Sequence, residues 1–357
     1  MPTRDELQIL QALSLDLKIS MTKRRLRDWI GHYGENGVYL SWSGGKDSTV
    51  LRHIIMQDWP NVESVFVNTG LEYPEIQAFV RAAKDRGEPV TILRPEMRFD
   101  EVIKKYGYPI ISKRVADTLY YARKNIAEGK DTQRVRQLAG SEMLRNGNPS
   151  MFNAKKYAPL VNVDFCISSM CCDVMKKKPL KVFQQKTDKV AITATTADES
   201  VFRKNRWLKH GCNAFDTKNP MSTPMAFWTE QDVLEYIKRY NVEIPSVYGD
   251  VVYERDPEQI RLVDMENYTV DCTEICEMLC TTGCDRTGCI FCAFGAHIRG
   301  DERFLSLKET HPRQYEYCIG GGEYNEDGIW QPNKQGLGMG HVFDELNRLY
   351  GDGFIKY

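Results

Sequence analysis

The sequence predicts an α/β protein built on a doubly wound parallel sheet. Apolar, strand-like runs alternate with stretches of helical apolar spacing between residues 38 and 240. The first run ends in a glycine turn that leads into a helix. The chain has 357 residues, of which 42% are hydrophobic, so it is long enough to bury such a sheet. Ligands of these sheets bind beyond the carboxyl ends of the strands.

The predicted elements follow one another in a regular order. Before the first strand, residues 4–33 show helical apolar spacing. Pro74 suits the first turn of a helix, and Thr229 suits an N-cap. We expect strands at residues 38–42, 62–67, 90–93 and 190–195. We expect helices at residues 49–57, 74–86, 99–106, 113–128 and 132–145, then one ending near residue 209 and one at 229–240.

The charge of the chain is almost balanced overall but uneven along the sequence. The net charge is −1, which excludes a global attraction to nucleic acid or membrane. Residues 101–160 contain 12 Lys and Arg against 5 Asp and Glu, whereas residues 241–282 contain 2 against 10. The acidic side chains Asp5, Glu6 and Asp16 near the N-terminus do not fit a signal peptide, and no apolar run has the length of a membrane span. We therefore expect a cytoplasmic protein without a membrane partner.

The most informative motif is Ser-Gly-Gly-Lys-Asp-Ser at residues 43–48, directly after the first strand. Two glycines let the backbone approach a phosphate closely, and a helix start offers free N–H groups and a positive dipole end. Lys46 adds a point charge, and Ser43 and Ser48 add hydroxyl donors. The spacing differs from Walker A, which has four residues before Gly-Lys. The motif resembles the PP-loop of the adenine-nucleotide α-hydrolase superfamily.

Two pairs of cysteines form a second constellation. Cys171 and Cys172 are adjacent, and Cys289 and Cys292 form a Cys-x-x-Cys pair. Four thiolates satisfy a [4Fe–4S] cluster or a tetrahedral zinc ion, and plain buried thiols are the third alternative. The lysines at 176–178 and Arg286 are near in sequence and favour ionised thiols. A further set recurs every four residues and would form one stripe on a helix: Cys272, Cys276, Cys280 and Cys284. Packing is favoured over a second metal site for this stripe, except for Cys284, which is nearest in sequence to the Cys-x-x-Cys pair.

Together these motifs resemble the phosphoadenosine phosphosulfate (PAPS) reductase family, from about residue 20 to about residue 315. The cysteine pattern is similar to the iron–sulfur motif of adenylylsulfate reductases, which implies a [4Fe–4S] cluster on the two pairs. Residues 68–75 are similar to the family's second strand-end motif, near the ribose and base. Residues 197–200, with two arginines on one helix face, resemble the segment that approaches substrate phosphates. The resemblance thus implies these nucleotide-binding residues: Ser43, Gly44, Gly45, Lys46, Asp47, Ser48, Asn68, Thr69, Gly70, Glu72, Glu199, Ser200, Arg203 and Arg206.

Two departures from the family bear on function. The reductases usually have an altered residue at the position of Lys46, whereas the loop is intact here, as in ATP pyrophosphatases. A sulfonucleotide has no β,γ-diphosphate for this lysine to hold, but ATP does. The reductases also end in a Glu-Cys-Gly-Leu-His tail whose cysteine attacks sulfur. That string does not occur in this sequence, and Cys318 is the only cysteine near the C-terminus.

Three functions stay open, and ATP-dependent sulfur chemistry is favoured. In this function Lys46 holds the ATP phosphates, Asp47 positions Mg²⁺, and an acceptor oxygen attacks the α-phosphate and releases pyrophosphate. The iron–sulfur proteins of DNA phosphorothioation and of tRNA thiolation resemble this arrangement. In the second function, PAPS or adenylylsulfate reduction, Cys318 attacks the sulfate sulfur and a thioredoxin-like reductant releases sulfite. In the third, the chain is a nucleotide- or cluster-binding partner protein without turnover.

The sequence also suggests a division into three consecutive segments. These are a helical N-terminal extension at residues 1–35, a nucleotide-binding α/β domain at 36–240, and a cysteine-rich region at 241–357 that completes the metal site. A nucleic-acid acceptor is compatible with the basic stretch at 101–160. No basic motif with interleaved aromatic residues marks such an acceptor site.

Overall fold

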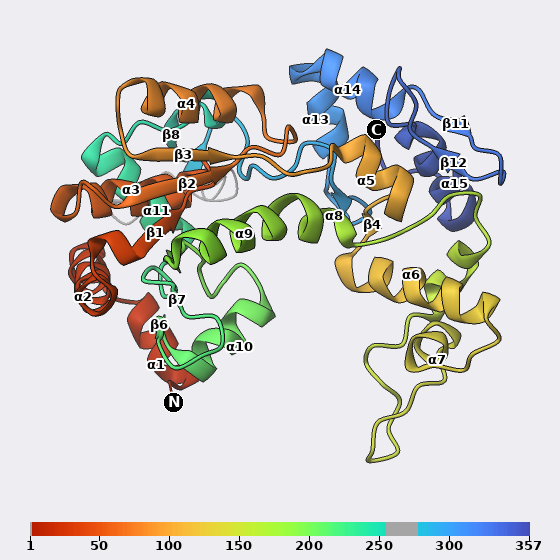
Figure 1. The fold of residues 1–357 in the computed structure, drawn as a ribbon, viewed down its shortest axis with the longest axis horizontal. Coiled ribbons are helices and arrows are strands. Elements are labelled where there is room, and N and C mark those ends of the chain that lie inside the picture. Colours follow the sequence, from red (N-terminus) through yellow and green to blue (C-terminus); the bar gives the residue numbers. More distant parts are fainter. Residues whose placement is uncertain (1, 255–277) are drawn as a thin grey trace, which may run out of the picture. The chain divides into compact units, whose positions relative to one another are not determined.

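A computed structural model describes residues 2–254 and 278–357 and divides the chain into two compact units (Figure 1). Unit 1 comprises Met1–Asn68, Glu72–Leu93 and Lys181–Thr287, and unit 2 comprises Thr69–Leu71, Arg94–Leu180 and Gly288–Tyr357. The units interleave along the chain, because the chain leaves unit 1 after its third strand and returns to it within a later helix. The bounds of the two units therefore differ from those of the three consecutive segments that the sequence suggested.

Unit 1 is built on a six-stranded sheet with the order β3-β2-β1-β5-β7-β6. All neighbouring strands are parallel except β6 and β7, which are antiparallel at one edge. From β1 the chain first builds β2 and β3 on one side and later adds β5 on the other. This makes the carboxyl end of β1 a topological switch point, where such sheets bind ligands. The strands are β1 (Val38–Ser41), β2 (Glu63–Val67), β3 (Val90–Leu93), β5 (Val190–Ile192), β6 (Asn213–Ala214) and β7 (Met221–Ser222).

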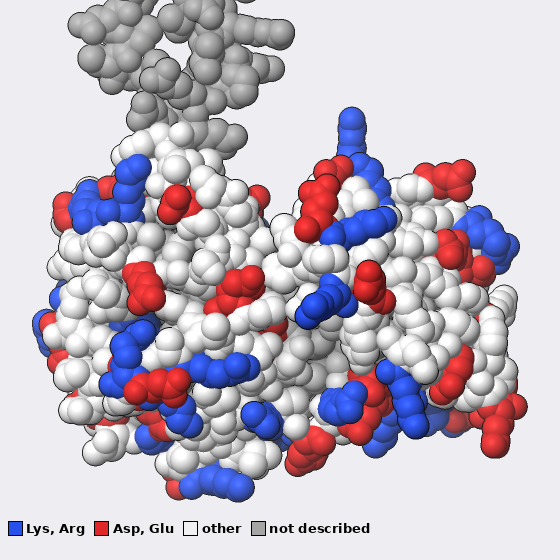
Figure 2. Space-filling model, turned by 90° about the horizontal axis from the view of Figure 1, so that it is seen from above, with Lys and Arg blue, Asp and Glu red and all other residues white. Residues whose placement is uncertain are grey.

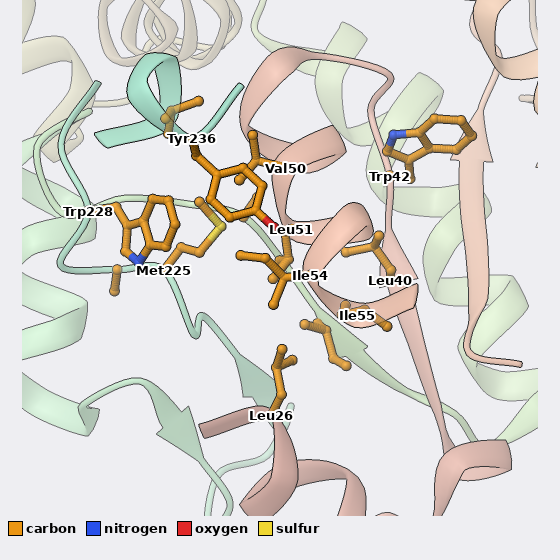
Figure 3. Packing of buried hydrophobic residues seen from close by; sticks show 14 of the residues in the cluster. Leu26, Leu40, Trp42, Val50, Leu51, Ile54, Ile55, Met225, Trp228 and Tyr236 are labelled. Carbon is orange, nitrogen blue, oxygen red and sulfur yellow. The ribbon is translucent and has the colours of Figure 1, made fainter. Parts of the chain in front are cut away.

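The helices of unit 1 enclose a continuous apolar core. Helix α3 packs against α2 and α11, and α4 packs along β3 (Figure 1). Figure 3 shows side chains of α3 gathered with those of α2, β1 and α11 and with Trp228 in this core. The helices and short elements of unit 1 are α1 (Arg4–Gln11), α2 (Leu15–Tyr33), η1 (Glu35–Gly37), α3 (Lys46–Asp58), α4 (Pro74–Asp85), α10 (Val201–His210), α11 (Glu230–Tyr240), η4 (Ser246–Tyr248), β8 (Val251–Glu254) and β9 (Met278–Thr281).

Unit 2 is mainly helical and contains two-stranded pairings. Strand β4 pairs in parallel with β10, and β11 pairs antiparallel with β12. Helix α9 (Lys178–Thr187) begins in unit 2 and continues into unit 1. The elements of unit 2 are α5 (Phe99–Tyr106), β4 (Ile110–Ile111), α6 (Lys113–Ala127), α7 (Gln133–Ala139), η2 (Lys155–Val161), α8 (Met170–Cys172), η3 (Asp173–Lys177), β10 (Ala293–Phe294), α13 (Arg303–Thr310), α14 (Pro312–Ile319), β11 (Glu323–Tyr324), β12 (Trp330–Gln331) and α15 (Met339–Tyr350).

The α/β class with a parallel central sheet is confirmed, and most predicted elements occur within two or three residues of their expected bounds. Strand β3 and helix α5 have the expected bounds. The helix expected at residues 132–145 is shorter, because Gly140 takes a left-handed conformation with φ of 79° and ends α7. Thr229 caps α11 as expected, with its side chain accepting from the N–H of Asp232.

The surface mixes charges of both signs. The face drawn in Figure 2 carries Lys and Arg side chains interspersed with Asp and Glu. Within the basic stretch at 101–160, Arg134 pairs with Asp117 at 2.7 Å, and Arg136 pairs with Glu142 at 2.8 Å. Part of the local positive charge is thus neutralised inside unit 2. None of the helices in the described residues has the length and apolar character needed to cross a bilayer.

Candidate functional site

The loop at residues 43–48 lies between β1 and α3, and its glycines are required by its geometry. Gly44 has a φ of +72°, a backbone angle that residues other than glycine rarely adopt. A Cβ atom at Gly44 would lie 2.6 Å from Ile76 Cγ2 and 3.2 Å from Val80 Cγ2. The hydroxyls of Ser43 and Ser48 lie 2.9 Å apart and close the loop. Gly45 is the N-cap of α3, so the free N–H groups of this helix begin at the loop.

The packing of Gly44 leads to a stability prediction. We expect Gly44→Ala to lower the free energy of unfolding by about 2–4 kcal/mol, because it adds both left-handed strain and a clash with α4. The matched control is Gly87→Ala, since Gly87 has a φ of +80° but nothing within 4 Å of its would-be Cβ. The control should cost only about 1–2 kcal/mol in urea unfolding. Equal losses for the two variants would contradict the predicted clash.

The loop forms the floor of a cavity of about 360 Å³ in unit 1. This volume is within the range of small-molecule sites. The cavity combines two cations with four carboxylates, which is a suitable lining for a phosphate ligand that carries a divalent cation. Its lining residues are Ser43, Gly45, Lys46, Asp47, Thr196, Asp198, Glu199, Glu230, Tyr248, Arg286 and Thr287.

Lys46 is the most constrained charge in this cavity. Its side chain is only 3% exposed, and its Nζ lies 2.8 Å from Glu230 Oε1. Nζ also donates to the carbonyl oxygen of Asp285 and lies 5.5 Å from the ring centroid of Tyr248. The backbone N–H of Lys46 donates to the Tyr248 hydroxyl at 3.2 Å. Both donor groups of this residue therefore face the cavity side of the helix start.

Burial and neighbouring charges shift the acidic groups of the cavity in opposite directions. Burial raises the pKa of Asp47, and the charge of Lys46 opposes this effect. For Glu230, burial also raises the pKa, but the hydrogen bond and charge of Lys46 and the charge of Arg286 outweigh it, so the net pKa is lowered. Burial lowers the pKa of Arg203, whose charge also interacts with Asp47 and Arg286.

The structure brings together some of the residues expected to bind nucleotide and leaves others off the cavity wall. Ser43, Gly45, Lys46, Asp47 and Glu199 line it, with Gly44 and Ser48 directly behind them in the loop. Arg203 forms an ion pair with Glu199. Among the described residues, the remaining expected ones are not part of this lining: Asn68, Thr69, Gly70, Glu72, Ser200 and Arg206.

Five lining residues lie outside the motifs that the sequence suggested for this site: Thr196, Glu230, Tyr248, Arg286 and Thr287. Arg286 was expected near the cysteines but lines the cavity of unit 1. The sequence signal for Glu230 is its place in the first turn of α11, directly after the capping Thr229. Nothing local marks Tyr248 and Thr287, because they reach the loop only through the pairing of η4 with residues 283 and 284.

A second cavity, in unit 2, is lined by all four cysteines of the two predicted pairs. Cys171, Cys172, Cys289 and Cys292 share it with an otherwise mainly apolar set of residues, namely Leu71, Phe99, Pro109, Met175 and Lys176. In residues 2–254 and 278–357, no group of three or more His, Cys, Asp or Glu side chains is arranged so that it could hold a metal ion.

Local structure explains how the two pairs reach one cavity. Cys171 and Cys172 lie on α8, which continues into a π-helical turn at η3, a feature frequent at functional sites. Cys289 and Cys292 are joined by a tight turn in which the Cys292 N–H donates to the Cys289 carbonyl at 3.0 Å. Arg303 then donates to the Cys292 carbonyl at 3.0 Å and anchors this turn.

The electrostatics of the cysteine cavity favour a thiolate at Cys172. The hydrogen bond with Cys171 lowers the pKa of the Cys172 thiol, and the charges of Lys113 and Lys176 lower it further. The hydrogen bond with Cys172, followed by burial, raises the pKa of the Cys171 thiol. Lys176 was expected to provide this charge, whereas Lys113, at the start of α6, was not.

The other cysteines among the described residues do not line this cavity. Cys318 on α14 is fully buried, contacts the sulfur of Met339 at 3.5 Å, and has its pKa raised by burial. The predicted helical stripe is wrong for two of its members, because Cys280 lies on strand β9 and Cys284 lies in the irregular segment that follows this strand. Cys272 and Cys276 lie outside the described residues.

Comparison with known proteins places the chain in a family. The sequence matches the family model of the phosphoadenosine phosphosulfate reductase domain over residues 37–124 and 133–293, so the chain belongs to the PAPS reductase family. The match includes the loop at 43–48 and all four cysteines of the second cavity. No curated protein matches the sequence.

Several solved structures resemble this one at low sequence identity. A phosphoadenylyl-sulfate reductase from Candida auris, in a phosphate complex, is 14% identical, with 69% of this chain and 91% of that chain covered and a TM-score of 0.37. The NH3-dependent NAD synthetase of Campylobacter jejuni is 11% identical, with coverages of 71% and 85% and a TM-score of 0.33. The U34-tRNA thiolase NcsA of Methanococcus maripaludis, with its [4Fe-4S] cluster, is 17% identical, with coverages of 63% and 89% and a TM-score of 0.19. Because these TM-scores are low, the family assignment rests on the sequence match.

Proposed function

We propose that this member of the PAPS reductase family is an ATP-dependent sulfur-transfer enzyme. The observation that carries the proposal is the intact Lys46, which lies at the start of α3 with both of its donor groups toward a cavity of nucleotide-site size. A ligand with a chain of phosphates offers more contacts to such a lysine than a sulfonucleotide does. Gly45 is the N-cap of α3, so the first N–H groups of this helix lie at the loop, where an anionic ligand can bind them.

The cavity residues have separable roles in this proposal. Lys46 and Arg286 neutralise the phosphate charge, and Asp47 positions Mg²⁺. An acceptor oxygen forms a bond to the α-phosphorus, the bond from that phosphorus to the bridging oxygen breaks, and pyrophosphate leaves with the electron pair. A sulfur nucleophile of the hydrosulfide class then bonds to the activated acceptor atom, and AMP leaves with the former acceptor oxygen. The protein contributes positioning and charge neutralisation to both steps.

The four cysteines of unit 2 fit an iron–sulfur cluster by their donor set. They are thiols in two close pairs around one cavity, with Lys113 and Lys176 lowering the pKa of Cys172. A bound [4Fe–4S] cluster would provide the sulfur chemistry that the second step needs. Cys171, Cys172, Cys289 and Cys292 would hold this cluster, and the turn anchored by Arg303 would keep the second pair in place.

One experiment tests this function against reduction of a sulfonucleotide. The full chain is purified without oxygen, assayed for iron and acid-labile sulfide, and incubated with ATP and Mg²⁺ or with PAPS and thioredoxin. In each incubation, pools of transfer RNA and of DNA are offered as acceptors. Release of pyrophosphate and appearance of sulfur in an acceptor support sulfur transfer. Release of sulfite from PAPS would instead establish a reductase, and binding of ATP without turnover would establish a binding protein.

Cys318 gives a sharper prediction within the same assay. Because its thiol is fully buried and its pKa is raised, we expect Cys318→Ala to keep the turnover of the unaltered chain within about twofold. Its unfolding free energy should fall by only about 1–2 kcal/mol, which is the cost of removing a buried sulfur. A loss of a hundredfold or more in product formation by a folded variant would identify Cys318 as a nucleophile and favour the reductase.

A further inference from the structure

Groups of the chain itself already occupy two positions at which the loop would bind phosphate. The first is the ammonium of Lys46, which pairs with the Glu230 carboxylate at 2.8 Å and with the carbonyl of Asp285. The second is the backbone N–H of Lys46 at the start of α3, which donates to the Tyr248 hydroxyl at 3.2 Å. A carboxylate and a hydroxyl oxygen thus face the donors that an anionic ligand needs.

Neighbouring contacts hold these two groups in place. Glu230 Oε2 also lies 3.7 Å from Nη2 of Arg286, so one carboxylate faces both cations of the cavity. The Tyr248 hydroxyl lies 2.5 Å from Thr287 Oγ1. Two backbone hydrogen bonds connect η4 to the segment that carries Arg286 and Thr287. The N–H of Gly283 donates to the carbonyl of Tyr248, and the N–H of Cys284 donates to that of Val247, both at 2.9 Å. All of these residues belong to unit 1.

The burial of Lys46 explains why such internal partners are needed. An ammonium that is only 3% exposed requires a counter-charge, because an unpaired buried charge is strongly destabilising. Glu230 provides it, yet its own side chain is 42% exposed and stands at the first residue of α11. A carboxylate with this exposure can turn into solvent without a large desolvation change. Lys46 then exchanges one anion for another.

We propose that Glu230, together with Tyr248, is an internal competitor that occupies the phosphate positions of this loop until a polyphosphate ligand displaces it. This inference rests on the proposed function, since it concerns regulation of the same nucleotide site. It assigns Glu230 a role opposite to that of a ligand-binding residue, because it stabilises the free protein and opposes binding. The arrangement also favours polyphosphate ligands. When Glu230 and Tyr248 leave, both the ammonium and the backbone N–H of Lys46 need a new acceptor, and a chain of phosphates can offer one to each.

Glu230→Gln tests the competitor by the sign of its effect. The amide keeps the shape of the side chain but loses its charge, so we expect the dissociation constants for ATP and for inorganic pyrophosphate to fall roughly three- to tenfold. The free variant should melt at a lower temperature than the unaltered protein, because Lys46 loses its counter-charge. Its rise in melting temperature at saturating ATP should be larger. Isothermal titration and thermal melts of the full chain measure these quantities.

Two matched controls separate the effect from general changes in the helix or core. Glu235→Gln alters a carboxylate of the same helix that is 44% exposed and paired with Arg239, and it should leave both dissociation constants unchanged. Tyr248→Phe frees the N–H of Lys46 and should tighten pyrophosphate binding. Tyr236→Phe should leave pyrophosphate binding unchanged, because it removes the hydroxyl of an equally buried residue, and this hydroxyl lies 2.9 Å from His53 Nδ1.

The possible outcomes distinguish this inference from the proposed function. If ATP binds the unaltered chain and Glu230→Gln binds it equally or more weakly, the competitor is excluded while the nucleotide site stands. If Glu230→Gln binds more tightly and Glu235→Gln does not, the competitor is supported. If neither the unaltered chain nor Glu230→Gln binds ATP or pyrophosphate, the competitor and the proposed function are both excluded.

Discussion

Lys46→Met is expected to lower kcat/KM for ATP-dependent pyrophosphate release by about a thousandfold. Methionine keeps most of the volume of a side chain that is only 3% exposed, but it removes the ammonium at the start of α3. Removal of one preorganised charge or hydrogen-bond donor from a phosphate or oxyanion site typically costs about 10²–10³ in rate. The loss should appear in pyrophosphate release, in ATP affinity, and in the extent to which ATP raises the melting temperature.

Lys189→Met is a suitable control for this variant. Lys189 also belongs to unit 1 and is paired with a carboxylate, Glu63, at 2.6 Å, but it does not line the cavity. The control should keep kcat/KM within about twofold while losing at most about 1 kcal/mol of stability. If Lys46→Met kept the activity of the unaltered chain, or if Lys189→Met lost as much activity as Lys46→Met, the lysine of the loop would not be the phosphate ligand.

Cys172→Ser and Cys289→Ser are each expected to remove most of the bound iron and acid-labile sulfide. The four thiols share one cavity, and a cluster that loses a thiolate ligand is held less tightly and is more exposed to solvent. The unaltered chain, purified without oxygen, should contain about four iron atoms and about four sulfides per chain. Sulfur transfer should fall with the iron content, whereas ATP binding in unit 1 should persist. Metal analysis, visible absorption and ATP titration measure the three effects.

Cys166→Ser is the control for these two variants, because Cys166 lies in unit 2 and is half-buried but is not part of the cysteine cavity. It should retain the iron and sulfide of the unaltered chain. Equal metal loss from Cys166→Ser would contradict the assignment of the four ligands. One zinc ion per chain without labile sulfide would replace the cluster with a structural tetrahedral site.

Local patterns in the sequence were sufficient for the α/β class and most element bounds. Strand β3 and helices α4, α5 and α11 follow from apolar periodicity together with Pro74 and Thr229, and each depends on residues close in the chain. The same holds for the loop at 43–48, whose glycine and lysine spacing depends only on the local strand, turn and helix. The early end of α7 was missed, because the left-handed conformation of Gly140 ends the helix before the apolar pattern does.

The division of the chain could not be obtained in the same way. Residues 69–71 belong to a different unit from the residues on both sides of them, and α9 passes from one unit to the other. Such an arrangement depends on which surfaces pack together, and composition along the chain does not record it. For the same reason, the residues of the motif at 68–75 are divided between the two units. Leu71 lines the cysteine cavity of unit 2, whereas Tyr73 and Glu75 belong to unit 1.

By itself, the sequence determined the parallel sheet, the position of the glycine loop at the end of β1, and the presence of two close pairs of cysteines. These features depend on residue types at short spacing, where backbone geometry and side-chain chemistry act locally. Only the tertiary structure decided that Glu230 and Tyr248 contact Lys46, that Arg286 lines the cavity of unit 1, and that Cys318 is buried. These contacts join residues that are roughly 180–240 positions apart or depend on complete burial, so they exist only once the core has formed.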